Sequence, residues 1–152
     1  MKRAFIGIVF ALAAGCGGSS SNNSGGGTKN LANFEGTVWN GQITTTVTCP
    51  GTSAQSSSAA YAVVFSPGTG ADLQYTSQAG CIYKFNVSGN TAALSNAPVS
   101  CSTSVSGTTV TLTWTSYNVT TSDGHALSLT ADGTGSAQGQ TCPFSMTGSA
   151  TR

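Results

Sequence analysis

The stretch CIYKFNV, residues 81–87, places cysteine, tyrosine, phenylalanine and valine at alternate positions. A period of two is that of a β-strand with one buried face, because successive side chains of a strand point to opposite faces. The same alternation occurs in Tyr61–Phe65, Val110–Trp114 and Trp39–Val47. After the first fifteen residues, no stretch has the period of a helix. We therefore predict an all-β protein.

Turn-forming residues divide the chain into separate strands. They are Pro67-Gly68, Ser88-Gly89-Asn90, Ser106-Gly107 and Asp123-Gly124. The pattern predicts about eight strands, at residues 36–49, 59–66, 70–76, 80–88, 90–104, 108–121, 125–138 and 141–151. Because the connections are short, consecutive strands should form an antiparallel up-and-down meander. Pro98 predicts a bulge or break in the fifth strand, and Asp132-Gly133 allows a further turn in the seventh.

The positions of the four cysteines after residue 30, namely Cys49, Cys81, Cys101 and Cys142, test this arrangement. If the strands run alternately up and down, all four lie at one end of the sheet, with their side chains on the apolar face. In a closed or nearly closed barrel the first strand meets the last, so the pairs of lowest strain are Cys49 with Cys142 and Cys81 with Cys101. Closure also removes exposed sheet edges. An open β-sandwich is the alternative, and mapping the disulfides separates the two.

The same register brings Trp39, on the first strand, beside Arg152 at the end of the last. This pair resembles the lipocalin arrangement, in which a tryptophan on the first strand closes the barrel floor beneath an arginine on the last. The usual lipocalin spacing has one residue between glycine and tryptophan, whereas two residues separate Gly36 from Trp39. The resemblance therefore serves as an architectural analogy for the barrel floor only.

The N-terminus has the layout of a secretory signal peptide. Lys2 and Arg3 precede an apolar run, Ala4–Ala14, which is too short for a permanent membrane-spanning helix. The sequence Ala13-Ala14-Gly15-Cys16 then resembles the lipobox of bacterial lipoproteins, whose cysteine is lipidated and becomes the first residue of the mature protein. The alternative is an ordinary signal peptide cut nearby, with Cys16 free or in a disulfide.

The cysteine count favours lipidation. Of five cysteines, setting Cys16 aside leaves four, an even number, as expected for disulfides in an exported protein. Residues 17–28 have the Gly/Ser/Asn composition of a flexible linker. We thus expect a signal peptide (1–15), a lipidated cysteine with linker (16–30) and a β domain (31–152). By resemblance to sorted lipoproteins, Gly17 after the cysteine implies the outer membrane, with the domain periplasmic or surface-facing.

Composition argues against several function classes. Charged residues make up 6% of the chain and the net charge is +1, which disfavours nucleic-acid binding. His125 is the only histidine and the carboxylates are scattered singly, so we predict no catalytic site, no metal site and no cofactor. Threonine rows at 44–48 and 109–115 could bind ice or polysaccharide, although β-propensity on a solvated face is the commoner explanation of such rows.

Inward-facing aromatic residues suggest a second hypothesis. They would either line a cavity for a small apolar ligand or fill the interior of the barrel. The six residues concerned are Tyr61, Phe65, Tyr83, Phe85, Trp114 and Phe144. We therefore expect a monomeric, membrane-anchored lipoprotein of the cell envelope with a non-catalytic binding or structural role. Its partner would be an envelope component, or alternatively a small apolar ligand carried inside the barrel.

Overall fold

The computed structural model describes residues 28–105 and 107–152. Within them the fold is all-β, with one short 3-10 helix, η1 (Leu31–Asn33). The strands are β1 (Trp39–Val47), β2 (Gln55–Val63), β3 (Ser66–Pro67), β4 (Leu73–Thr76), β5 (Ile82–Ser88), β6 (Thr91–Leu94), β7 (Val99–Val105), β8 (Thr108–Thr121), β9 (Ala126–Ala137) and β10 (Gln140–Thr151). No helix in this part of the chain has the length and apolarity needed to cross a bilayer.

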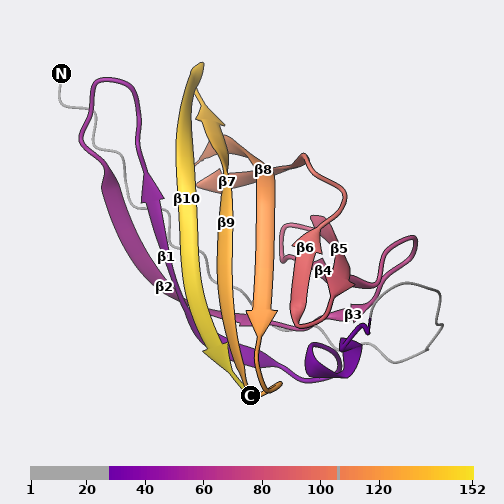
Figure 1. Ribbon diagram of the computed structural model, residues 1–152. Helices are drawn as coiled ribbons and strands as arrows, with labels where there is room; N and C mark the ends of the chain where they lie inside the picture. The colour runs from indigo at the N-terminus through magenta and orange to yellow at the C-terminus, as the bar shows by residue number, and fades with distance from the viewer. Residues whose placement is uncertain (1–27, 106) are drawn as a thin grey trace.

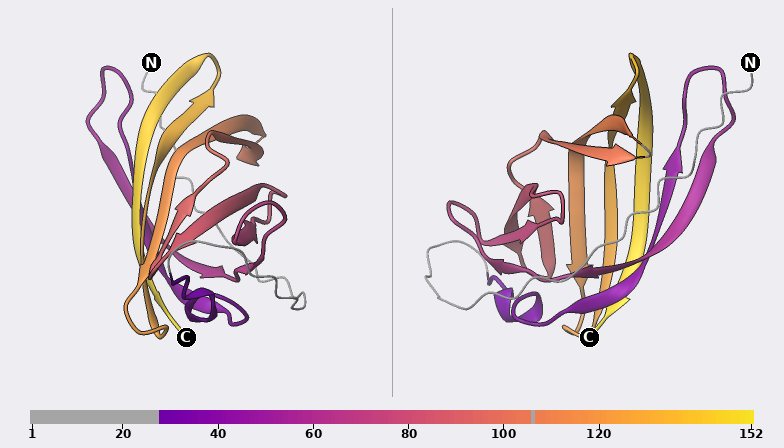
Figure 2. Two further views of the ribbon diagram at one scale, coloured as in Figure 1. Left: turned by 45° about the vertical axis from the view of Figure 1, so that its right-hand side comes forward. Right: turned by 180° about the vertical axis from the view of Figure 1, so that it is seen from behind.

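All ten strands belong to one antiparallel sheet, in the order β2-β1-β10-β9-β8-β6-β5-β4-β3, with β7 also paired to β8. The sheet curls strongly into a half-barrel (Figures 1 and 2). Its first and last strands pair, from Asn40 opposite Thr151 to Val47 opposite Phe144. The predicted antiparallel meander is therefore confirmed, and the open sandwich of two sheets is not formed.

One continuous segment joins the two edges of the half-barrel. β2 pairs with β1, and after only two residues the chain enters β3, which pairs with β4. β8 is long enough to pair with two strands along one of its edges: β6 pairs with its second half and β7 with its first half. The second and fifth predicted strands are each divided in this way, which gives ten strands instead of eight.

Pro98 causes the division of the fifth strand, as predicted. It has no N–H to donate to a ladder, so pairing stops after Leu94 and resumes at Val99. The turn considered at Asp132-Gly133 does not form, because β9 runs through both residues.

A β-bulge interrupts β8 opposite these residues. Trp114 pairs with Gly133 and Ser116 with Asp132, which leaves Thr115 as the extra residue. A bulge shifts the alternation of side chains by one position. Even-numbered residues such as Leu112 and Trp114 are accordingly buried before the bulge, whereas the odd-numbered Tyr117 and Val119 are buried after it.

Both disulfides join the predicted partners. Cys49 is bonded to Cys142, and Cys81 to Cys101, with sequence separations of 93 and 20 residues. We call the end where β10 begins the rim, and the opposite end, where Arg152 lies, the floor. Cys49 follows β1 and Cys142 lies near the start of β10, so this disulfide braces the rim.

The packed part of the domain begins slightly before the predicted start at residue 31. Lys29 forms a bridge with Gly89, and the Asn30 N–H donates to the Gly89 carbonyl at 3.2 Å. Lys29 Nζ also lies 2.7 Å from Asp72 Oδ1, in an ion pair with both side chains partly buried. Residues 29 and 30 therefore belong to the β domain rather than to the linker.

Candidate functional site

The six aromatic residues proposed as a cavity lining form one group inside the half-barrel. Each is at most 8% exposed. All six belong to one buried core. The rings of five of them make pairwise contacts, with centroids 5.6 Å apart for Phe65 and Phe85, 5.8 Å for Tyr83 and Trp114, and 4.7 Å for Trp114 and Phe144. We call these six residues, together with Tyr117, the aromatic cluster. All seven residues are part of the buried core of the described chain.

Tyr117 is the member that sequence reasoning missed. It is 5% exposed, and its ring lies 5.3 Å from that of Phe85 and 5.8 Å from that of Tyr83. Burial and the neighbouring phenols Tyr61, Tyr75 and Tyr83 raise the pKa of Tyr117 well above its ordinary value. Without the bulge, the alternation that buries Leu112 and Trp114 would place the Tyr117 side chain on the outer face. The signal that was available is the odd-numbered alternation of Tyr117 and Val119.

Trp114 carries a buried donor without a partner. Its side chain is 8% exposed, and its Nε1–H has no hydrogen-bond acceptor among the described residues. A buried polar group left unpaired costs about 1–3 kcal/mol. The concave side therefore offers one unused hydrogen-bond donor among its aromatic rings.

At the floor, the Arg152 side chain contacts several segments of the chain. Its guanidinium lies 4.5 Å from the centre of the Trp39 ring, in a cation–π contact. The same side chain donates to the backbone carbonyls of Glu35 and Gly124. Trp39 Nε1–H donates to the Phe34 carbonyl at 3.0 Å, so the fully buried indole is also satisfied. The structure thus brings together the two residues proposed for the barrel floor.

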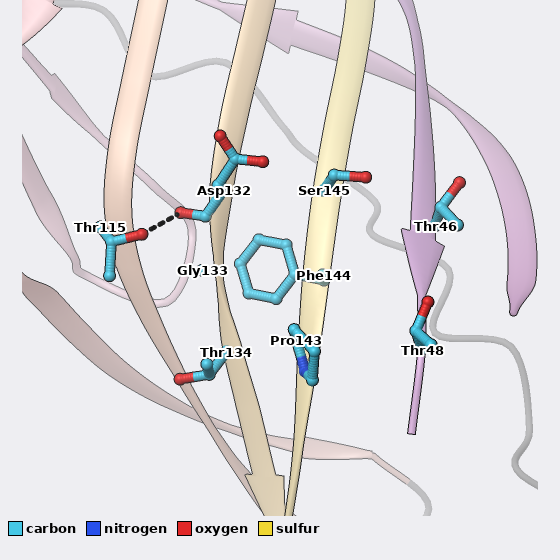
Figure 3. A pocket seen from close by; sticks show the side chains of 9 residues that line it. All are labelled: Thr46, Thr48, Thr115, Asp132, Gly133, Thr134, Pro143, Phe144 and Ser145. Carbon is cyan, nitrogen blue, oxygen red and sulfur yellow. Dashed lines mark hydrogen bonds between the residues drawn. The ribbon is translucent and has the colours of Figure 1, made fainter. Parts of the chain in front are cut away.

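A shallow depression of about 310 Å³ lies on the outer face, across β8, β9, β10 and the end of β1 (Figure 3). We call it the outer depression. It is lined by Thr46, Thr48, Thr115, Asp132, Gly133, Thr134, Pro143, Phe144 and Ser145. The bulge at Thr115 lies at its edge, and the Thr115 hydroxyl donates to the Asp132 backbone carbonyl at 3.2 Å. From the sequence, Thr46, Thr48 and Thr115 were singled out as members of threonine rows, Phe144 as an inward-facing aromatic residue, and Asp132-Gly133 as a possible turn; none was predicted to form this depression.

His125 belongs neither to the aromatic cluster nor to the outer depression. It is exposed in the turn between β8 and β9, where the Asp123 carboxylate accepts its backbone N–H at 2.8 Å and that of Ala126 at 3.1 Å. These two bonds lower the pKa of Asp123. In residues 28–105 and 107–152, no three His, Cys, Asp or Glu side chains gather as metal ligands would. Cys16 lies outside the described residues.

Comparison with known proteins finds no match to a family model, a curated protein or a solved structure. The aromatic cluster and the outer depression are therefore interpreted from their own geometry and chemistry.

Proposed function

We propose that this protein is a lipid-anchored lipoprotein of the bacterial cell envelope, with a β domain that binds without catalysis. The observation that carries the proposal is the lipobox-like sequence Ala13–Cys16, followed by a domain whose four cysteines are all used in two disulfides. Because those four are paired with each other, none is left to bond with Cys16. Its thiol is then available for a thioether to a diacylglycerol.

The disulfides also support export, because such bonds persist in oxidising compartments such as the periplasm or the cell surface. Residues 17–28, rich in Gly, Ser and Asn, would tether the domain within roughly 20 Å of the membrane, from an end-to-end distance of about 5–6 Å times the square root of the length. Gly17, in place of Asp, favours the outer membrane of a two-membrane bacterium.

Mass spectrometry of the full chain, expressed in a two-membrane bacterium, tests the anchor. We expect the N-terminal peptide to begin at Cys16 and to carry a diacylglyceryl thioether. Cys16→Ser should lose the lipid and move from the membrane to the soluble fraction. A Gly17→Ser variant, which leaves the lipobox intact, is the matched control and should stay lipidated. An N-terminus at another residue, or an unmodified Cys16, would overturn the proposal.

A small apolar ligand on the concave side is the second candidate. The unpartnered Trp114 Nε1–H favours it, because a ligand with an acceptor oxygen and an apolar body would satisfy that donor within the aromatic cluster. Titration of the full chain with a hydrophobic fluorophore tests this candidate. Saturable uptake at one site that weakens in Trp114→Phe supports a carrier. Absence of uptake means that the rings form a solid core.

A further inference from the structure

The outer face of the sheet carries hydroxyl groups that are mostly paired with each other. On β1 and β2, Thr44 pairs with Ser58 and Thr46 with Ser56, each at 2.8 Å. On β7 and β8, Ser100 pairs with Thr113 at 2.9 Å and Ser102 with Thr111 at 3.0 Å. These cross-strand pairs flank the outer depression on both sides. Hydroxyls in such pairs have used part of their hydrogen-bonding capacity.

Inside the outer depression, the hydroxyls of Thr46 and Thr115 are hydrogen-bonded, but three other hydroxyls are not bonded to any part of the chain that the structure describes. The hydroxyls of Thr48, Thr134 and Ser145 have no hydrogen-bond partner among the described residues. The Asp132 carboxylate accepts one bond, from Ser116 Oγ to Oδ2 at 2.9 Å, which leaves Oδ1 unused. Pro143 adds an exposed apolar ring beside them (Figure 3). The outer depression therefore combines free hydroxyls, a carboxylate and a small apolar surface.

The charge of the outer depression restricts its ligand. Asp132 is its only charged residue. The cations of the described chain are occupied elsewhere: Lys29 by Asp72, Lys84 by the Thr69 carbonyl, and Arg152 by the floor carbonyls. An anionic ligand would meet uncompensated repulsion from Asp132. A neutral ligand with neighbouring hydroxyls can donate to the carboxylate in charge-assisted hydrogen bonds.

We propose that the outer depression binds one sugar unit of a neutral polysaccharide. The sugar hydroxyls would donate to Asp132 and exchange hydrogen bonds with Thr134 and Ser145, while a C–H face of the ring packs on Pro143. A volume of about 310 Å³ lies at the lower end of the range of about 300–1,000 Å³ for ligand pockets, as suits a single sugar ring. The inference deepens the proposed binding role of the domain, and it does not depend on lipidation of Cys16.

Isothermal titration calorimetry of the full chain tests the proposal. The neutral probes are hexasaccharides of glucose (α- and β-linked) and of N-acetylglucosamine, and a galacturonate hexasaccharide is the anionic probe. We expect saturable binding of a neutral probe. Asp132→Asn keeps the shape of the side chain but removes the charge, and should weaken binding about tenfold or more. Ser145→Ala should also weaken it. Thr44→Ala, on the same face outside the outer depression, should leave binding unchanged.

Three outcomes would overturn the proposal. The first is that no neutral probe binds at about 10 mM, so that any dissociation constant is weaker than millimolar. The second is equal binding by wild type and Asp132→Asn, with unfolding midpoints showing that both are folded, and the third is preference for the anionic probe. Binding of Ca²⁺ at Asp132 in the absence of sugar would instead make the outer depression a cation site. None of these results bears on the lipid at Cys16, which mass spectrometry measures separately.

Discussion

Arg152 joins segments that are far apart in the sequence. Its guanidinium covers Trp39 and donates to the carbonyls of Ala32, Glu35 and Gly124. A lysine ammonium is a compact charge that lacks the planar fork needed to stack on the ring and bond several carbonyls at once. We expect Arg152→Lys to lower the free energy of unfolding by about 1–2 kcal/mol. Urea unfolding followed by tryptophan fluorescence measures this change.

Lys84→Met is the matched control for that experiment. Lys84 Nζ makes one exposed bond, to the Thr69 carbonyl at 2.8 Å, so its removal should change stability by less than about 0.5 kcal/mol. If the Arg152 variant is no less stable than this control, the contacts at the floor contribute nothing measurable.

Gly133 and Gly135, two residues apart on β9, form a natural pair for mutation. A Cβ on Gly133 would lie 2.2 Å from the Thr113 carbonyl oxygen and 2.7 Å from the Phe144 ring, whereas one on Gly135 meets nothing closer than Leu112 Cδ2 at 3.4 Å. We expect Gly133→Ala to cost about 2 kcal/mol or more, because backbone and a packed ring must move. Gly135→Ala should cost little. Similar urea midpoints for the two variants would contradict this account.

Among the strands, the sequence predicted the regular features and missed one local irregularity. β8 occupies 108–121, as expected from its alternation of β-branched and large apolar residues. Its bulge was not foreseen, because Thr115 and Ser116 are polar neighbours that also fit a regular strand with one side chain facing out. One extra residue moves every later side chain to the other face, which is why Tyr117 was not among the residues predicted to face inward.

The disulfides were predictable for a different reason. Strand parity and a first-to-last pairing are properties of topology, and they do not require exact strand ends. Cys49 and Cys142 therefore came out as partners even though the second and fifth predicted strands are each divided in two.

The two disulfides should differ in their contribution to stability. In the chain-entropy model, the bridge spanning 93 residues contributes about 4–5 kcal/mol and the one spanning 20 about 3 kcal/mol. We expect Cys49→Ser/Cys142→Ser to lower the urea midpoint more than Cys81→Ser/Cys101→Ser. The reverse order would show that strain or packing at the bridges outweighs the entropy of the unfolded chain.

Considered as a whole, the half-barrel has two chemically different faces. Its concave side holds the aromatic cluster, and its outer side carries paired hydroxyls around the outer depression. The first could be predicted from alternation within single strands. The second could not, because it depends on the register of four strands that brings Thr46, Thr115, Asp132 and Ser145 together from distant parts of the chain. The β8 bulge at Thr115 lies opposite Asp132 and also determines which β8 residues lie beside it.

The concave side also predicts how the whole fold responds to alkali. Burial raises the pKa of Tyr61 and of Tyr75 to about 12, with a further contribution from Tyr61 at Tyr75. Burial also raises the pKa values of Tyr83 and Tyr117 well above the ordinary value of a phenol. In the unfolded chain these phenols ionise near pH 10. Between pH 10 and 12 the unfolded state has therefore lost protons that the native state retains, so stability is complete below pH 10 and falls as pH rises.

Each tyrosine should remove up to about 1.4 kcal/mol of unfolding free energy per pH unit in this range. Urea midpoints at pH 9 and pH 11 measure the loss, and the ultraviolet absorbance of phenolate reports ionisation directly. Tyr83→Phe should make the pH dependence shallower, because it removes one buried phenol from the aromatic cluster. If phenolate appears near pH 10 while the protein is still folded, the tyrosines are solvated, and the concave side is open to water rather than filled by packed rings.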